Sequence, residues 1–332
     1  MRQPRAPQES LPAGTHRPVL LAEVLEALAP VAGARFVDGT FGAGGYSRAL
    51  LEAGASVVAI DRDPNVAALA EVLGREFGAR FRFVAGSFAD LDNLAGELPI
   101  DGVVLDIGVS SMQLDDGARG FSFMRDGPLD MRMAASGESA ADLVNRLDEA
   151  DLANLLYAYG EERKSRRIAH VIAAARATAP IATTTELARL IERAIGRKPG
   201  DAHPATRSFQ ALRIAVNDEL GQLVEGLFAA ERLLSEDGRL AVVAFHSLED
   251  RIVKRFLDPQ KGATQQSRHL PQAEIAEPRW VAVSKAVKAG SAELAGNPRA
   301  RSAVLRSARR SGAVARPVSA EGLGLPVIRS AA

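Results

Sequence analysis

A glycine-rich turn that follows an acidic residue is the part of this chain best suited to chemistry. The run from Arg35 to Ser47 starts with a short apolar stretch, reaches Asp38, passes four glycines and enters a helical segment. Glycines let backbone N–H groups approach a ligand at a helix start, as in nucleotide-type cofactor sites. Because the Asp38 carboxylate repels phosphate and attracts a cation, the pattern favours S-adenosylmethionine (SAM), which has an adenosine, a positive charge and no phosphate. The alternative is that Asp38 only forms the turn before Gly39.

Three more side chains that suit a cofactor site follow predicted strands. They are Asp61 after residues 57–60, Phe88 after residues 81–85 and Asp106 after residues 101–105. Ligands of open parallel sheets bind outside the carboxyl ends of the strands, so these side chains should meet at one edge. We expect Asp61 to bind the ribose hydroxyls, Phe88 to lie against adenine and Asp106 to lie beside the reaction point. Asp61 could instead cap the next helix, and Phe88 could belong to the core.

Short apolar strands alternating with helical segments predict an α/β fold, a Rossmann-like parallel sheet covered by helices on both faces. The expected strands are residues 35–37, 57–60, 81–85, 101–105 and 240–245, with a closing antiparallel pair at 279–283 and 302–306. The expected helices are residues 18–28, 47–53, 65–77, 139–147, 149–160, 165–179, 185–195, 204–234 and 248–257. Asp148 and Thr183 precede two of these helices and are predicted N-caps.

The same pattern divides the chain into parts. From about residue 115 to residue 213 no convincing strand occurs, which predicts an all-helical insertion domain that closes over the ligand edge. The expected organisation is a cofactor-binding domain at 16–114 and 214–310, a substrate-recognition insertion at 115–213, disordered tails at 1–15 and 311–332, and a mobile polar loop at 258–276.

Composition and charge narrow the class of protein. The chain is 47% apolar and 25% charged, as in ordinary globular proteins. No apolar run approaches the ~20 residues of a membrane span and no signal-peptide core is present, so we expect a cytoplasmic protein. Residues 251–332 hold 15 basic and 5 acidic residues, whereas residues 1–250 hold the remaining 26 basic and 36 acidic residues. A basic end on an acidic body fits a polyanionic partner or a solvated tail equally well.

Cysteine is absent from the chain. This excludes disulfides, Cys-ligated zinc and iron–sulfur clusters. It also removes the thiolate that C5-methylation of cytosine requires. A base methyltransferase of this composition should therefore act on an exocyclic nitrogen, a ring nitrogen or a ribose oxygen.

Several longer motifs resemble those of a known family. They are Asp106 to Asp115 (DIGVSSMQLD), Arg119 to Met133 (RGFSFMRDGPLDMRM), Asp38 to Ser47, Tyr159 to Arg163 (YGEER), His203 to Arg207 (HPATR), Phe245 to Arg251 (FHSLEDR) and Asn297 to Ser302 (NPRARS). Together they resemble the bacterial SAM-dependent small-subunit (16S) ribosomal RNA cytosine-N4 methyltransferases, over roughly residues 16–310. The resemblance implies a Rossmann-like SAM-dependent methyltransferase sheet with an all-helical insertion.

The family's cofactor contacts can be carried over by position. They would fall on Gly44, Gly45, Tyr46, Asp61, Phe88, Asp106 and Gln113, beside Asp38 and Gly42 of the turn. Two positions depart from the family pattern. Tyr46 replaces the usual His, so a role that needs imidazole is in doubt, and Met112 replaces the usual Pro, so the loop carrying Gln113 should be looser.

The implied substrate is a cytosine in the decoding region of small-subunit ribosomal RNA. Its N4 amine is a poor nucleophile because its lone pair is delocalised into the ring. We expect a hydrogen-bond acceptor to draw on the amine N–H while the site fixes its geometry. Asp106 is the first catalytic candidate and His246, after the predicted strand 240–245, the second, although a lone His is more often structural.

The RNA contacts are expected on the loop that enters the insertion and near the C-terminus. A base taken out of its stack is commonly held by aromatic or Arg planes. The candidates are Phe121, Phe123, Arg119, Arg125 and Arg132, with Arg299 and Arg301 as phosphate contacts. The aromatic residues could equally form a packed pair inside the insertion.

Three rival functions stay open on sequence alone. An NAD-dependent oxidoreductase would share the fold, but Asp38 and the lack of a clean G-x-G-x-x-G disfavour it. The second rival is a non-catalytic RNA-binding protein. The third is a DNA amino-methyltransferase, but such enzymes usually have a Pro-Pro-aromatic segment where this chain has Ile107-Gly108-Val109. We expect no metal in the cofactor site. The sequence leaves open whether a metal lies at the RNA interface and whether the protein is a homodimer. It also leaves open whether the partner is naked RNA or the 30S subunit.

Overall fold

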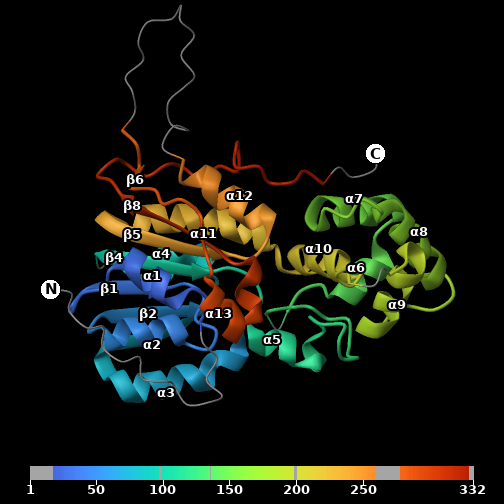
Figure 1. Ribbon diagram of the computed structural model, residues 1–332, viewed down its shortest axis with the longest axis horizontal. Helices are drawn as coiled ribbons and strands as arrows, with labels where there is room; N and C mark the ends of the chain where they lie inside the picture. The colour runs from blue at the N-terminus through green and yellow to red at the C-terminus, as the bar shows by residue number, and fades with distance from the viewer. Residues whose placement is uncertain (1–17, 97–98, 135, 198–199, 259–276, 329–332) are drawn as a thin grey trace, which may run out of the picture.

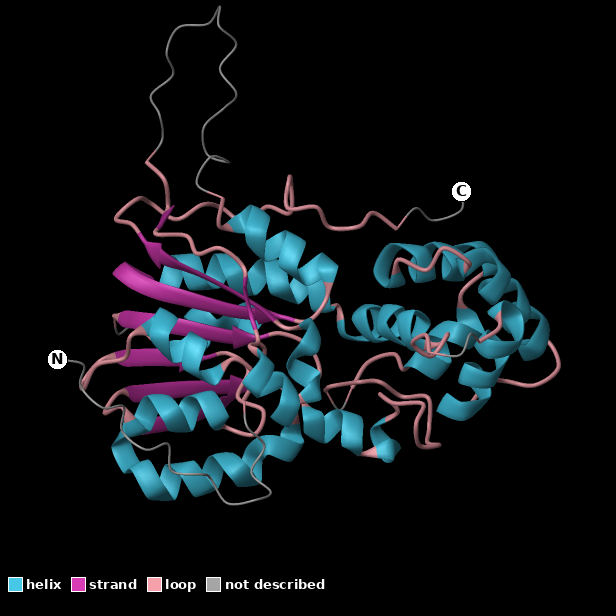
Figure 2. Cartoon of the chain, in the orientation of Figure 1, coloured by secondary structure: helices cyan, strands magenta, loops and turns pink. Residues whose placement is uncertain are grey.

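The computed structural model describes residues 18–96, 99–134, 136–197, 200–258 and 277–328. One eight-stranded sheet with helices on both faces forms the larger lobe, and a cluster of helices forms the smaller lobe beside it (Figures 1 and 2). The strands are β1 (Arg35–Asp38), β2 (Ser56–Asp61), β3 (Phe81–Ala85), β4 (Ile100–Asp106), β5 (Leu234–Ala244), β6 (Trp280–Val281), β7 (Val287–Lys288) and β8 (Val304–Arg310).

The sheet has the order β3-β2-β1-β4-β5-β8-β6, with β7 also paired to β8. Strands β1 to β5 are parallel and β8 is antiparallel to β5, so the predicted parallel sheet is confirmed. The chain order reverses between β1 and β4, whose Val37 and Val103 are partners. Such a reversal opens a crevice at the carboxyl ends of the strands, which is where ligands of these folds bind.

Helices cover both faces of the sheet. One face carries α1 (Leu21–Leu28), α2 (Gly45–Glu52) and α3 (Ala67–Phe77), and the other carries α4 (Leu91–Ala95), α11 (Glu219–Leu233) and α12 (Ser247–Phe256). Neighbouring residues of a strand point to opposite faces. Phe36 of β1 therefore packs in the core on the α1–α3 side, whereas Val37 packs in the core on the α11 side.

The smaller lobe has an apolar core of its own. It is built from α6 (Ala140–Arg146), α7 (Glu149–Gly160), α8 (Ser165–Arg176), α9 (Thr184–Ile195) and α10 (Thr206–Asn217). In the described part of residues 115–213, the only β pairing is an isolated bridge between Pro128 and Thr183. Thr183 caps α9 as predicted, because its side chain accepts a hydrogen bond from the Glu186 N–H. Asp148 precedes α7, but its side chain makes no capping hydrogen bond.

The predicted helix over residues 204–234 is wrong in one respect: it is two helices. The chain breaks at Asp218, whose φ is 46°, so α10 ends and α11 begins there. The buried Asn217 side chain holds the break in place, because it donates to the Met131 carbonyl (2.7 Å) and accepts from the Met133 N–H (2.8 Å). Tertiary hydrogen bonds thus override a sequence with helical spacing on both sides.

Two strand boundaries also differ from expectation. β5 starts at Leu234, six residues before the predicted start, and its pairing with β4 contains a register shift between Ile100 and Gly102. The closing antiparallel pair is present, but Trp280 pairs with Arg310 rather than with residues 302–306. The short helices α5 (Ser111–Asp115) and α13 (Ser291–Gly296) lie between the two lobes (Figure 1).

The prediction of a disordered tail from residue 311 is wrong for residues 311–328. Arg316 is bound to the buried carboxylate of Glu231, which also accepts a hydrogen bond from the Trp280 indole (2.9 Å). Leu323 is 4% exposed in the core beside α12. The predicted N-terminal tail and all but the first residue of the predicted loop 258–276 lie outside the described residues. In the part of the chain that the structure describes, no helix is both long and apolar enough to span a membrane.

Candidate functional site

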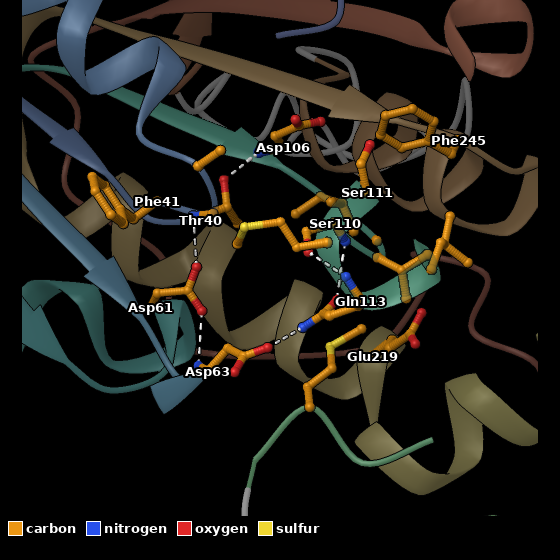
Figure 3. A pocket seen from close by; sticks show the side chains of 18 of the residues that line it. Thr40, Phe41, Asp61, Asp63, Asp106, Ser110, Ser111, Gln113, Glu219 and Phe245 are labelled. Carbon is orange, nitrogen blue, oxygen red and sulfur yellow. Dashed lines mark hydrogen bonds between the residues drawn. The ribbon is translucent and has the colours of Figure 1, made fainter. Parts of the chain in front are cut away.

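A cavity of about 500 Å³ lies at the carboxyl ends of β1, β2 and β4, where the chain order reverses (Figure 3). This volume is within the usual range for sites that enclose a small ligand. Nine of the predicted site residues line it: Gly42, Gly45, Tyr46, Asp61, Phe88, Asp106, Gln113, His246 and Arg299. The lining does not include the other predicted residues, which are Asp38, Gly44, Arg119, Phe121, Phe123, Arg125, Arg132 and Arg301. The larger lobe supplies most of the wall, and Thr206, Gln210 and Arg213 of α10 close it from the smaller lobe.

The glycine-rich turn forms one side of the cavity. Gly42 and Gly44 have φ values of 50° and 78°, a backbone region that side chains other than glycine rarely adopt. The Gly42 N–H donates to Asp61 (2.8 Å), and Gly44 is the N-cap residue of α2. The turn therefore lines the cavity with the backbone of Gly42 and Gly45 beside the side chains of Thr40 and Phe41.

Asp38 lies behind this turn and not on the cavity wall. Its carboxylate is fully buried and accepts hydrogen bonds from the Ser47 hydroxyl (2.7 Å) and the Thr40 N–H (3.2 Å). Burial raises the pKa of Asp38 to about 6, although these two hydrogen bonds act in the opposite direction. Asp38 therefore supports the turn, and its charge reaches the cavity only through space.

Asp61 and Asp63 form the floor beside β2. Asp61 accepts from the N–H groups of Gly42 and Asp63, and burial raises its pKa above the ordinary value. Asp63 is 4% exposed and binds both Gln113 Nε2 (2.7 Å) and the Arg119 guanidinium (2.9 Å). Asp63 also caps the short helical turn that follows β2, through the Asn65 N–H. It was not predicted as a site residue, because an acid before Pro64 reads as an ordinary helix cap.

Gln113 is held by both ends of its side-chain amide. Its Oε1 accepts from the Ser110 N–H while Ser110 Oγ accepts from the Gln113 N–H, which is a capping box at the start of α5. Its Nε2 donates to Asp63, as Figure 3 shows. These bonds fix the loop after β4 from two sides, although Met112 lacks the backbone restraint of proline.

Asp106 is the most unusual group of the site. Its backbone N–H donates to Thr40 Oγ1 (2.7 Å), which fixes the end of β4 against the turn. Its Oδ1 atom is buried and has no hydrogen-bond partner among the described residues. Burial and the nearby charges of Asp38 and Glu249 raise the pKa of Asp106 to about 8. A buried carboxyl oxygen without a hydrogen-bond partner on a cavity wall is costly in the free protein, and a polar or cationic guest can satisfy it.

The two predicted aromatic contacts lie in different surroundings. The Tyr46 hydroxyl donates to the Val19 carbonyl, so it ties the segment before α1 to α2 instead of facing a ligand. Burial raises the pKa of Tyr46 well above its ordinary value, so the hydroxyl keeps its proton. Phe88 is partly buried, packs on the core at α11 and still exposes part of its side chain to the cavity.

The cavity wall also contains His246, the N-cap residue of α12. Its Nδ1 accepts from the Glu249 N–H (3.4 Å), and Glu249 Oε2 accepts from the N–H groups of Phe245 (2.8 Å) and His246 (3.2 Å). Arg213 of α10 binds both carboxylate oxygens of Glu219 (2.7 and 2.8 Å) next to this pair. Sequence reasoning missed Glu249, Arg213 and Glu219. The available signal for Glu249 was its place three residues after His246, the spacing of a capping box.

The predicted RNA contacts are dispersed. Phe121 is 6% exposed in the core of the smaller lobe, and Phe123 packs against His203 and Phe209 at ring distances of 4.5 and 4.9 Å. The interpretation of these two as packed aromatic residues matches their placement. Arg132 is paired with Asp130 (2.6 Å) away from the cavity. Arg299 lies at the cavity and pairs with the exposed Asp115 (2.7 Å), and Arg301 is exposed.

Charge at the site favours a cationic guest. Asp63 is paired with Arg119 and Glu219 with Arg213, whereas Asp61 and Asp106 form no ion pair with any described residue. Asp61, and Asp106 once a nearby positive charge lowers its pKa, suit a sulfonium better than a pyrophosphate. The backbone turn, Asp61 and Asp106 therefore fit SAM, in which the positively charged sulfur is bonded to the 5′ carbon of the adenosine ribose.

A parallel sheet with a glycine turn after β1 and acids ending β2 and β4 is the arrangement of a SAM-dependent methyltransferase. Residues 13–311 match the model of the MraW methylase family. The chain is 59% identical over 297 residues to the ribosomal RNA small subunit methyltransferase H of Chelativorans sp. (strain BNC1), an alignment that covers 89% of this chain and 87% of the relative. It is 58% identical over 317 residues to the protein of the same name from Cereibacter sphaeroides (strain ATCC 17025 / ATH 2.4.3), with 94% and 95% covered. The chain belongs to the MraW methylase family, which confirms the resemblance found in its motifs.

Proposed function

We propose that this protein transfers the methyl group of SAM to the exocyclic N4 of a cytosine in the decoding region of small-subunit (16S) ribosomal RNA. The single observation that supports this most is the buried Oδ1 atom of Asp106 on the wall of the cavity, which has no hydrogen-bond partner in the described part of the chain. The names of the 58–59% identical relatives support small-subunit ribosomal RNA as the substrate. The absence of cysteine is consistent with methylation at nitrogen rather than at C5.

The cofactor is held, in this proposal, by the elements at the ends of the first strands. Gly42 and Gly45 offer backbone to the ligand, Asp61 accepts the ribose hydroxyls and Phe88 borders the adenine. When bound, SAM supplies an activated methyl group on a positively charged sulfur. Asp38, Gly44 and Gln113 act indirectly, because they fix the turn and the loop after β4.

Asp106 and His246 act on the amine. Asp106 accepts a hydrogen bond from the cytosine N4–H, which increases the electron density on the nitrogen and orients it. In the free protein Asp106 is mostly protonated at neutral pH, since its pKa is about 8. A nearby positive charge lowers that pKa and turns the carboxyl into an acceptor. His246 faces the same cavity and can take the proton that the amine loses after transfer.

The two lobes have different roles in this proposal. The sheet lobe, residues 16–114 and 214–310, binds the cofactor, and the helical insertion, residues 115–213, recognises the RNA. Arg299 beside the cavity and the exposed Arg301 are positioned to contact phosphates. Because small ribosomal subunits are assembled in the cytoplasm, we place the protein there, acting on naked RNA or on the 30S subunit.

The deciding experiment measures transfer of labelled methyl from SAM to purified small subunits and to naked 16S RNA. The modified nucleotide is then identified by mass spectrometry of nuclease digests. N4-methylcytosine at one position of the decoding region supports the proposal. Methylation at another atom, or RNA binding without methyl incorporation, contradicts it.

A further inference from the structure

Two of the sequence motifs have no part in the proposed methyl transfer. They are Tyr159 to Arg163 and His203 to Arg207, and the structure brings them together where the end of α7 packs on the start of α10. A Cβ atom added at Gly160 would lie 2.5 Å from the carbonyl oxygen of Arg207. A side chain at this position would therefore push the two helices apart, and glycine lets them meet.

This contact holds the side-chain amide of Gln210 in one orientation. Gln210 Nε2 donates to the carbonyl oxygen of Tyr159 (3.1 Å), which lies in the last turn of α7, where carbonyl groups have no partner within the helix. A carbonyl oxygen only accepts hydrogen bonds, so the amide nitrogen must face it. A flipped amide would set two oxygen atoms against each other. Gln210 Oε1 is therefore the free end of the amide, and no described residue donates a hydrogen bond to it.

Gln210 lies on the face of α10 that borders the cavity. Thr206, Gln210 and Arg213 are spaced by four and three positions, which places them on one side of the helix, and all three line the cavity. Asp106 lines the same cavity from the end of β4. Gln210 and Asp106 thus offer acceptor oxygens to one cavity from two different lobes.

Arg213 links this face of α10 to the surroundings of Asp106. Arg213 lies one turn after Gln210 and binds Glu219 (2.7 Å). An oxygen atom of Glu219 lies within 4.8 Å of an oxygen atom of Glu249, whose charge acts on Asp106. The contacts therefore run from the Gln210 face of the helix to the end of β4, where the proposed function places the reacting amine.

We propose that Gln210 determines the specificity for cytosine by accepting a hydrogen bond from the second N4–H of the base. The inference rests on the proposed function, in which Asp106 accepts from the first N4–H. The two N–H groups of an exocyclic amine lie in the plane of the ring, so two acceptors fix that plane. The nitrogen then presents one face to the methyl group of SAM, which lowers the entropic part of the barrier.

The orientation of the amide explains why uracil is rejected. Uracil has a carbonyl oxygen in place of the amine, and this oxygen would face Gln210 Oε1 without a proton between them. Gln210 cannot turn its Nε2 to that oxygen, because it would lose its bond to Tyr159 and place Oε1 against another carbonyl. A site built to bind an N–H discriminates strongly against an analogue that lacks it.

The test compares the affinity of the full chain for RNA with cytosine and with uracil at the target position. The RNA is the decoding-region fragment or the small subunit that the transfer assay shows to be accepted, and S-adenosylhomocysteine fills the cofactor site. Because this product has no positive charge, Asp106, with its pKa of about 8, keeps its proton at pH 6 and does not itself disfavour uracil. We expect the wild-type protein to prefer cytosine by about tenfold or more. Gln210→Met keeps the length and the helix propensity of the side chain and should reduce this preference to less than about twofold.

Gln222→Met is the matched control, because it makes the same change on the same cavity. Gln222 Oε1 already accepts from the Ser87 hydroxyl, so this substitution should leave the preference for cytosine unchanged. A preference that survives in folded Gln210→Met would overturn the proposal. If that variant fails to fold, the wild-type protein decides the case, since equal binding of both RNAs would also overturn it. Failure of methyl transfer to cytosine N4 would instead contradict the proposed function, so the two failures have different signatures.

Discussion

Replacing Asp106 by Asn should make the unfolding free energy of the SAM-free protein fall less steeply as the pH rises. Asp106 has a pKa of about 8 in the folded protein against an ordinary value of 3.8. Between these values the folded state holds a proton that the unfolded state has released. The folded state therefore binds more protons, and its stability falls as pH rises through this window. The asparagine side chain has nearly the same shape and does not titrate, so Asp106→Asn escapes this loss.

The magnitude follows from the width of the window. Each pH unit inside it costs the wild-type protein about 1.4 kcal/mol relative to the variant. Between pH 5 and pH 7 the difference in unfolding free energy should therefore grow by about 3 kcal/mol in favour of Asp106→Asn. For a chain of 332 residues that corresponds to roughly 4 °C in melting temperature. Asp38, with a pKa of about 6, titrates in both proteins and largely cancels in the comparison.

The assay is urea unfolding of both proteins at pH 5, 6 and 7 without SAM, supported by melting temperatures in the same buffers. Methyl transfer by Asp106→Asn should fall at least about a hundredfold, because the variant lacks the anionic acceptor. Two stability curves that stay parallel across this range would refute the reasoning, since they would mean that the Asp106 carboxyl is neither buried nor unpartnered.

Four further outcomes follow from the same geometry. The wild-type protein should prefer SAM over S-adenosylhomocysteine several-fold more at pH 9 than at pH 6, because ionised Asp106 attracts the positive sulfur. Calorimetry measures both affinities, and Asp106→Asn should lose this trend. Asp63→Ala should lower the unfolding free energy by about 3 kcal/mol in urea, since it removes the only carboxylate paired with the Arg119 guanidinium among the described residues and leaves it two backbone carbonyls; an unchanged midpoint contradicts this. Arg299→Gln should reduce the slope of log RNA affinity against log salt by about one, and an unchanged slope would remove Arg299 from the RNA contacts. Phe123→Ala should cost about 3 kcal/mol because the ring packs against Phe209, and a loss below 1 kcal/mol would show that this packing is weak.

The strands and their terminal acids could be predicted because both signals are local. A parallel sheet buried on two faces needs short, nearly continuous apolar runs, and β3 has the predicted boundaries. Asp61 and Asp106 follow such runs directly, so their place at the cavity follows from the topology alone. The helices of the smaller lobe were predictable for the same reason, since α7 repeats its apolar residues at helical spacing.

The parts that sequence missed depend on contacts between distant segments. The break at Asp218 has no glycine or proline, and it exists because Asn217 binds the chain near Met131. Asp38 looked like a cavity residue because it ends β1, yet Ser47 of the following helix draws it into the core. The tail after residue 311 has little periodicity, but Glu231 gives Arg316 a buried partner 85 positions away in the chain.

The cavity draws its wall from both lobes, and this has a thermodynamic consequence. Thr206, Gln210 and Arg213 of α10 face the same space as Asp61 and Asp106 of the sheet. Any molecule that fills this space links the free energy of SAM binding to the relative position of the two lobes. By reciprocity, an RNA that shifts the insertion must change the affinity for SAM by the same factor by which SAM changes the affinity for that RNA. Substrate engagement can therefore be read from cofactor affinity alone, without following the reaction.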